Sequence, residues 1–543
     1  MTVGGAVLFL LYLVLVVLRE LAHPVNTDNA TFLYITQHML RGELALYKDF
    51  LETNPPFFVL HNLLPVLAAE LTGADAFLLF KLWVFALILG SALWGAHLSG
   101  RGGLSSYEGL ALAAAFVVAA TYLPQDDFGQ REHMALILGW PYVLMQAGRQ
   151  LGGRYTRSEI GLTGVMAALG FLIKPFFLFV PVFLTLLAWW QTRRMSVFWR
   201  PEFLIIVAGG VLYVLVVRLF FPEYLTDVVP LLLQSYTALE QPMLLRLAFI
   251  ILAVPYATPL IFGFLLLPAV LAAIHHEKDP RIRTYLAYLF LALSGFLLSG
   301  FVQGKPWRYT YISYFMILFA IALWLILLWG FRLRKRTGWR ERPSLSLMRL
   351  LAVFSAAVLL QGWPGSYPTD KKIEMTRDVV RFVQPGERVM ALVTDNGILF
   401  PMVNVHGLKS VWRFVNLWPA MPAILERLEK ETSEAGLSAR ARKLERRLLS
   451  SITEDLDKGN PELVLIEKGA VRYYYFPKGA VFDVDAYLAN FPAFRERLEQ
   501  RYAPVHETRY LRFYLRRDLL RRARLPSAGG NSLTASQQAG SLQ

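Results

Sequence analysis

Three polar stretches of this sequence lie beside long apolar runs, and their side chains are of the types that move protons and bind phosphate. In the first stretch, Asp28 follows an apolar run, and Tyr47, Asp49 and the pair Pro55-Pro56 come after it. A carboxylate such as Asp28 can accept the proton of a hydroxyl group, and a double proline restricts the backbone to a shaped loop. The simpler alternative is that Asp28 caps a helix and Asp49 is a turn residue.

The second stretch, residues 125–133, places charged groups between two apolar runs. It contains Asp126, Asp127, Arg131, Glu132 and His133. Charged side chains at a membrane boundary are costly to desolvate and usually belong to a functional site. A helix cap would account for one acid but not for the whole set.

The third set consists of cations: Lys174 within an apolar stretch, and Lys305 and Arg308 in one later loop. A lysine among apolar residues needs a partner or a water-filled cavity, although its side chain can also extend to the membrane interface. Together with Arg131, these cations would form a receptor for a phosphate group, which Lys and Arg bind through charge-assisted hydrogen bonds.

The composition indicates a membrane protein. Of 543 residues, 55% are hydrophobic and 17% are charged, and the net charge is +15. We attribute the basic excess to arginines beside spanning helices and not to nucleic-acid binding. Cysteine is absent, which excludes disulfides, thiolate metal sites and cysteine nucleophiles. Neither a Walker loop nor a dinucleotide glycine fingerprint occurs, so nucleotide-driven transport and nicotinamide chemistry lack a phosphate-binding loop.

The apolar runs predict an α-helical, polytopic membrane protein with about 11 transmembrane helices, because each crossing needs roughly 20 apolar residues. The predicted spans are 3–18, 75–98, 106–123, 133–147, 159–173, 175–190, 203–221, 247–273, 284–301, 310–330 and 347–361. Residues 55–71 are apolar but contain prolines and polar side chains, so we expect an interfacial or re-entrant helix there.

Basic residues predict the orientation. Most Arg and Lys of the short connections fall on one side if the amino terminus is cytoplasmic, as the positive-inside rule requires. Residues 19–74 and everything after about 362 then face outward from the cytoplasmic (inner) membrane. The three polar stretches lie on that same extracytoplasmic or periplasmic side.

We predict three parts: a transmembrane catalytic domain at 1–361, a small α/β extracytoplasmic domain at 362–526, and a disordered tail at 527–543. In the second part, residues 388–393 and 462–466 are typical of buried strands, and residues 420–450 are typical of one charged amphipathic helix. The tail has no apolar pattern.

At these polar residues the sequence resembles the glycosyltransferase C superfamily, which includes protein O-mannosyltransferases and the lipid A aminoarabinose transferase. The likeness covers about residues 1–330 and lies in the order of its motifs. These are Asp28, Tyr47 with Asp49, Pro55-Pro56, Glu132 before the fourth span, Lys174-Pro175, Gln303-Gly304-Lys305 and Tyr309. Three positions depart from the usual pattern: Asn29 stands where many members have Glu, Asn54 precedes the double proline in place of Lys, and Thr310 follows Tyr309 in place of His.

The resemblance implies an inverting glycosyltransferase that uses a polyprenyl monophosphate sugar and a hydroxyl acceptor of the cell envelope, which could be a glycolipid, a polysaccharide or a protein. It implies Asp28 as the general base, with Glu132 orienting the acceptor or sharing that role. Donor phosphate binding is expected from Lys174, Arg131, Lys305 and Arg308. The remaining pocket residues are expected to be Tyr47, Asp49, Asp126, Asp127, His133, Gln303 and Tyr309. No cofactor or metal is required, although carboxylates such as Asp28, Asp49 or Asp126 would also suit a divalent ion.

Two other functions fit part of the pattern. A non-catalytic transporter or flippase of a lipid-linked sugar would use the same cations but would not need Asp28 and Glu132 at the outer face. A polymerase or ligase with a diphosphate donor would share the topology and differ in its leaving group.

Overall fold

The chain forms two compact units in a computed structural model that describes residues 3–236, 267–268, 270–305, 307–337, 376–430, 436–468 and 482–523. The first, here called the helical unit, comprises Met1–His23, Ala68–Val216 and Gln241–Gly365. The second, the mixed unit, comprises Pro24–Leu67, Val217–Glu240 and Ser366–Gln543. The predicted division at residues 361–362 and the predicted tail at 527–543 lie outside the described residues.

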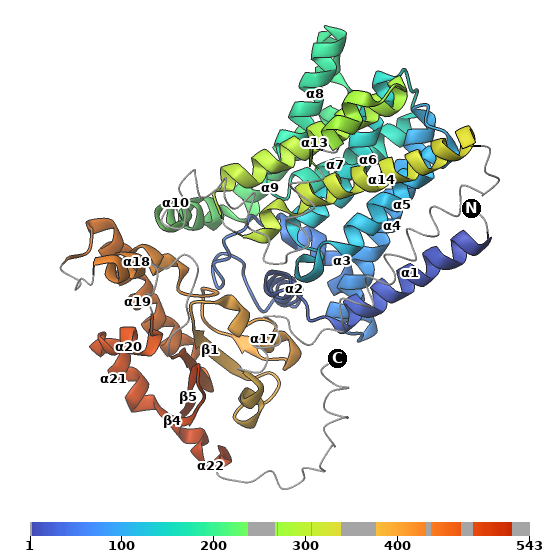
Figure 1. The fold of residues 1–543 in the computed structure, drawn as a ribbon. Coiled ribbons are helices and arrows are strands. Elements are labelled where there is room, and N and C mark those ends of the chain that lie inside the picture. Colours follow the sequence, from blue (N-terminus) through green and yellow to red (C-terminus); the bar gives the residue numbers. More distant parts are fainter. Residues whose placement is uncertain are drawn as a thin grey trace. The chain divides into compact units, whose positions relative to one another are not determined.

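The helical unit is a bundle of long helices (Figure 1). Its helices are α1 (Val3–Ala22), α4 (Ala76–Arg101), α5 (Ser106–Tyr122), α6 (Arg131–Gln150), α7 (Arg157–Phe171), α8 (Phe179–Thr192), α9 (Pro201–Phe220, whose end belongs to the mixed unit), α13 (Pro280–Gln303) and α14 (Ile312–Thr337). Helix α6 packs against α4, α7, α13 and α14. Every residue of α6 from Arg131 to Gly148 is therefore buried.

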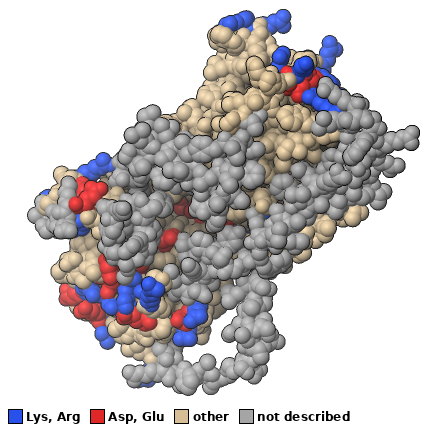
Figure 2. All heavy atoms as spheres, viewed as in Figure 1, with Lys and Arg blue, Asp and Glu red and all other residues tan. Residues whose placement is uncertain are grey.

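Five of the described helices are long and apolar enough to cross a membrane, or six if Phe9–Ala22 and Thr27–Leu40 are counted as one broken span. Helix α9 exposes Val211, Leu212 and Val214, as a helix facing lipid does. The side of this unit drawn in Figure 2 shows few charged groups, and Lys and Arg gather where α8 ends. The predicted span 347–361 and most of 247–273 lie outside the described residues, so the count of eleven stays a prediction.

The mixed unit contains a five-stranded sheet in the order β2-β1-β3-β5-β4. The strands are β1 (Arg388–Leu392), β2 (Lys409–Ser410), β3 (Leu463–Glu467), β4 (Tyr502–Glu507) and β5 (Leu511–Arg516). Strands β2, β1 and β3 are parallel, whereas β5 pairs antiparallel with β3 and β4. The two central strands β1 and β3 are those expected from the sequence, and β3 is buried along its whole length.

One sequence prediction in this unit is wrong. The helix expected at 420–450 is two helices, α18 (Met421–Lys430) and α19 (Ala439–Gly459). Ser438 begins α19 as its N-cap, because its side chain accepts a hydrogen bond from the Ala441 amide. The shorter helices α20 (Val484–Ala489), α21 (Pro492–Arg501) and α22 (Leu520–Ala523) complete this part of the unit.

Segments from the first third of the chain belong to the same unit. These segments are α2 (Thr27–Leu40) and most of α3 (Phe57–Thr72). Helix α10 (Val229–Ser235), from the middle of the chain, also belongs to this unit. The side-chain amide of Asn404 donates to the Ala30 carbonyl oxygen at 3.0 Å, and the main-chain amide of Ser410 donates to the Tyr34 hydroxyl at 2.9 Å. Helix α3 forms where the sequence predicted a helix at 55–71. The segment after α1 is thus held by the carboxy-terminal part of the chain.

Candidate active site

The first polar group of the helical unit lies at the start of α6. A short 3-10 helix, η1 (Gln125–Asp127), precedes it, and Gly129 has a positive φ of 76°. A Cβ atom at Gly129 would lie 2.5 Å from Phe80 Cζ, so only glycine allows this close turn. The turn places Arg131, Glu132 and His133 in the first turn of α6, where all three are buried. A carboxylate is favoured there because the helix amino terminus is partially positive.

Lys174 reaches the start of α6 from a break between two helices. Helix α7 ends at Phe171, and Pro175 begins the 3-10 helix η2 (Pro175–Leu178). Lys174 itself is extended, with φ −137°, as the residue before a proline prefers. Its Nζ lies 2.5 Å from Glu132 Oε1, and both side chains are buried. This pair supplies the partner that a lysine in an apolar segment requires.

A loop after α13 completes the cluster. Gln303 is the last residue of α13, and Gly304 ends the helix in a left-handed conformation. The Gln303 amide nitrogen donates to the Ser299 carbonyl oxygen at 3.1 Å, while its Oε1 accepts from Lys174 Nζ at 3.2 Å. The next residue, Lys305, is also buried.

Tyr309 presents its ring to two cations. It lies in η6 (Arg308–Tyr311), and its ring centroid is 5.5 Å from Lys174 Nζ and 5.5 Å from Arg131 Cζ. Such distances give cation–π attraction. The Tyr309 ring therefore offsets part of the repulsion between the two positive groups.

Glu132 has unused hydrogen-bonding capacity. Its Oε2 atom is buried and has no hydrogen-bond partner among the described residues, while its main-chain oxygen accepts from Ser313 Oγ at 2.6 Å. An unpaired buried carboxylate oxygen is costly. The cluster of Arg131, Glu132, Lys174, Gln303 and Tyr309, here called the Lys174 cluster, therefore has the chemistry to receive a polar ligand: two cations for an anion, and one carboxylate oxygen for a donor.

The other residues expected near this cluster have varied surroundings. His133 Nδ1 accepts a hydrogen bond from the Gly129 amide at 3.0 Å, so this imidazole holds the turn before α6. Asp126 and Asp127 form the end of η1, where Asp127 is buried and Asp126 is half-buried. The Arg308 side chain lies outside the described part of the chain.

Asp28 lies in the mixed unit, in the first turn of α2, and is half-buried. The cap of α2 is Asn26, whose side chain accepts from the Asp28 amide at 2.9 Å. The simpler alternative, that Asp28 is the cap, is therefore wrong. Asp28 Oδ1 instead lies 3.4 Å from the side-chain amide nitrogen of Asn396, Nδ2.

Asn396 was not among the residues expected at a site. It follows β1, in the 3-10 helix η8 (Asn396–Ile398), where Asp395 Oδ1 accepts from the Gly397 amide at 2.8 Å. The sequence signal was available: polar residues directly after a buried parallel strand commonly face a ligand. What the sequence lacked was any indication that this loop meets α2.

Tyr47 and Asp49 have structural contacts. Tyr47 is buried with φ 69°, and its hydroxyl donates to the Asn54 carbonyl oxygen at 2.5 Å. Asp49 is exposed and accepts from the Ala45 amide at 2.7 Å. Tyr47 therefore fixes the loop that leads to Pro55-Pro56, and Asp49 is the turn residue that the simpler alternative described.

Within the described residues, no group of three or more His, Asp and Glu side chains is placed to hold a metal ion. Two of the acids expected at the site bind other groups of the protein. Asp49 bonds to a main-chain amide and Glu132 bonds to Lys174.

Comparison with known proteins identifies the fold. No family model and no curated protein matches this sequence. Among solved structures, ArnT from Cupriavidus metallidurans bound to undecaprenyl phosphate is similar, with a TM-score of 0.55 and 15% identity over 95% of this chain and 98% of that one. The same protein in the apo state gives a TM-score of 0.52 and 13% identity over 94% and 96% of the two chains. This chain therefore has a fold similar to that of ArnT.

Proposed function

We propose that the protein is an integral membrane glycosyltransferase that moves a sugar from a polyprenyl monophosphate to a hydroxyl of an extracytoplasmic acceptor, with inversion at the anomeric carbon. The observation that carries this proposal is the buried Lys174 cluster, in a fold similar to that of ArnT solved with undecaprenyl phosphate. Burying these cations in an apolar bundle costs free energy, and a bound phosphate would offset that cost.

In this proposal Lys174 and Arg131 hold the phosphate of the donor. Both cations lie beside the Tyr309 ring, so they can contact one anion together. Glu132 forms an ion pair with Lys174, which neutralises the buried ammonium group. When the phosphate arrives, Lys174 divides its three donors between the carboxylate, Gln303 and the phosphate. Lys305 and Arg308 follow Gln303 in the same loop and add positive charge.

Asp28 is the general base of the proposed reaction. It takes the proton of the acceptor hydroxyl, whose oxygen forms a bond to the anomeric carbon while the bond from that carbon to the phosphate oxygen breaks. The polyprenyl monophosphate leaves with its electron pair, and the cations stabilise the added charge. The Asn396 amide orients the Asp28 carboxylate.

A turnover assay tests the proposal. Purified full-length protein in lipid nanodiscs is given undecaprenyl monophosphate sugars carrying mannose, glucose, arabinose or aminoarabinose, with a detergent extract of envelope glycolipids and polysaccharide as acceptor. Released undecaprenyl monophosphate is measured by mass spectrometry. We expect release with one of the donors, and loss of release in Asp28→Asn by about 10² to 10⁴-fold, the usual contribution of a positioned base.

Glu202→Gln is the control for loss of a carboxylate away from the proposed site, and it should release lipid phosphate like wild type. Glu202 is as buried as Glu132 and binds Arg149 and Gln146. Arg149 lies near the other end of α6, about 25 Å from Glu132 at the rise of an α-helix. A transporter would bind the donors and leave every sugar attached. A ligase would release lipid only from diphosphate donors. Either result, or Asp28→Asn turnover within a few-fold of wild type, contradicts the proposal.

A further inference from the structure

We propose that a cavity in the mixed unit binds the saccharide portion of the acceptor, and that this saccharide is an uncharged oligosaccharide. Its role as an acceptor subsite rests on the proposed function. The cavity has a volume of about 450 Å³ and is lined by α2, the loop after it, strands β1 and β2, and the end of α19. This volume is within the usual range for sites that bind small ligands.

The lining is charged, and it carries both signs. Three carboxylates line the cavity, and five cations line it as well: Lys48, Arg388, Lys409, Arg413 and Lys458 beside Glu43, Asp49 and Asp455. Figure 2 shows the same mixture of acidic and basic groups over the carboxy-terminal helices and strands. Only Leu44 and Val411 are aliphatic, which excludes a lipid tail as the occupant.

Mixed charge selects the ligand class. A sugar hydroxyl both donates and accepts hydrogen bonds, so one hydroxyl can donate to a carboxylate and another can accept from an ammonium group. A phosphate only accepts, and four of the five lining cations already pair with a carboxylate: Arg413 with Asp455, Lys409 with Glu43, Arg388 with Glu462 and Lys48 with Glu223. The charge of the cations is therefore largely balanced, and the three lining carboxylates would repel an anion. The lining therefore fits a polyhydroxylated, uncharged ligand better than an anion.

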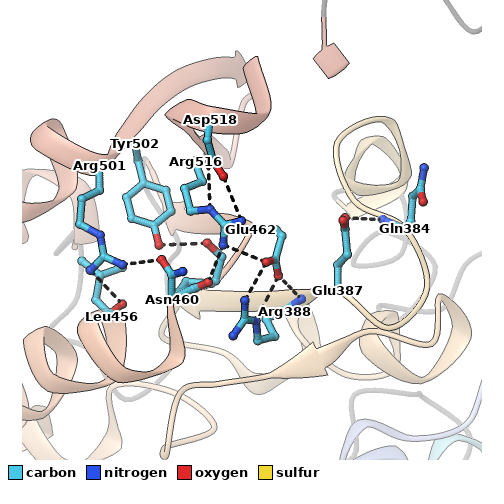
Figure 3. A network of polar contacts seen from close by, with 11 residues as sticks. Gln384, Glu387, Arg388, Leu456, Asn460, Glu462, Arg501, Tyr502, Arg516 and Asp518 are labelled. Carbon is cyan, nitrogen blue, oxygen red and sulfur yellow. Dashed lines mark hydrogen bonds and ion pairs between the residues drawn. The ribbon is translucent and has the colours of Figure 1, made fainter. Parts of the chain in front are cut away.

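The charged groups are held in place before any ligand binds. Arg413 and Asp455 pair at 2.6 Å, and Glu43 binds both His38 at 2.8 Å and Lys409 at 3.2 Å. Arg388 is fixed from outside the cavity by Glu462 at 2.9 Å, which Figure 3 shows together with Arg516 on the same carboxylate. A preformed polar lining reduces the ordering cost of binding.

The cavity and the proposed base share one helix. Tyr34 and His38 line the cavity from α2, and Asp28 lies six and ten residues earlier on that helix. The helical rise places Asp28 roughly 9 to 15 Å away along the axis. An oligosaccharide is long enough to occupy the cavity and present a hydroxyl at Asp28, whereas a single sugar is not.

Saturation-transfer NMR on full-length protein in nanodiscs tests this site. The probes are maltotriose, mannotriose and arabinotriose, with glucose 6-phosphate and glucuronic acid as anionic comparisons. We expect a signal from a neutral trisaccharide. Leu44→Trp, which puts a larger ring into the cavity, should weaken this signal. The double variant Asp49→Asn, Lys458→Ala should weaken binding about tenfold for each charged hydrogen bond lost.

Two variants separate this site from the rest of the protein. Lys443→Ala removes an exposed cation of α19 that does not line the cavity, and it should bind like wild type. Asp28→Asn should also bind saccharide normally while releasing no lipid phosphate. Binding without any donor turnover in wild type would keep the saccharide site and overturn the transferase. An unchanged signal in Leu44→Trp, no signal from any neutral trisaccharide, or a stronger signal from the anionic sugars would overturn the site.

Discussion

Replacing Glu467 with Gln should stabilise the protein in alkaline solution and not in acid. Glu467 ends β3, is 1% exposed, and accepts hydrogen bonds through Oε2 from the Thr394 amide at 2.6 Å and the Thr394 hydroxyl at 2.7 Å. Its Oε1 has no hydrogen-bond partner among the described residues. Burial raises the pKa of this carboxyl from 4.5 to about 7; the Thr394 hydrogen bonds lower the pKa in part, and the nearby Asp395 and Asp483 raise it by less.

The size of the effect follows from this pKa. The rise in the pKa of Glu467 from 4.5 to about 7 corresponds to about 3 kcal/mol. Because the folded pKa is raised, the contribution of Glu467 to stability is complete below pH 4.5 and is lost as the pH rises through 7. A Gln side chain never ionises and still offers an oxygen to Thr394. We therefore expect nearly equal stability at pH 4 and a gain of about 3 kcal/mol in the variant at pH 8.

Thermal unfolding of full-length protein, followed by intrinsic fluorescence at pH 4 and pH 8, measures this difference. At roughly 2–4 °C per kcal/mol for a domain of this size, Glu467→Gln should raise Tm by roughly 6–12 °C at pH 8 only. Glu462, at the other end of β3, is the matched control. Burial raises the pKa of Glu462, but the bonds from Arg388 and Arg516 outweigh it and hold the pKa at about 2. Glu462→Gln should therefore lower Tm at pH 8. A Glu467→Gln protein with the same pH dependence as wild type would refute the reasoning.

Three further predictions concern the reaction. Lys174→Ala should raise the donor KM by about tenfold or more, since one charge-assisted bond to phosphate is lost; an unchanged donor KM in the lipid-release assay would remove Lys174 from phosphate binding. Asn396→Ala should lower kcat and leave the donor KM and Tm unchanged, whereas Asn404→Ala, which loses only its bond to Ala30, should keep kcat; equal kcat in both variants would contradict the orienting role. Tyr309→Phe should bind donor like wild type and Tyr309→Leu should bind it more weakly, because the cations contact the ring face; equal affinity of the two variants would exclude this contact.

The Lys174 cluster could be predicted largely from the sequence. A lysine within an apolar segment requires a partner, and a Gln and a Tyr beside Lys305 had the order of a known family. The structure brings Lys174, Glu132, Gln303 and Tyr309 together. The partner of each group could not be read from the sequence, because α6, η2 and the end of α13 meet only through tertiary packing.

Asn396 and the make-up of the mixed unit could not be predicted. Periodicity located β1 and β3 correctly, but it contains no signal for the contact between the loop after β1 and α2. The break between α18 and α19 was missed for a local reason. Arg and Glu at spacings that allow intrahelical pairs suggested one helix, whereas Ser438 begins a new helix by capping α19.

The contact between Asp28 and Asn396 has a consequence for biogenesis, because 368 positions separate the two residues. At about 5–20 residues per second of translation, the acid is synthesised roughly 20 to 70 s before its amide partner. A nascent chain thus carries Asp28 before its Asn396 partner exists. Ribosomal stalling or premature termination before Asn396 would leave a polypeptide in which this contact cannot form.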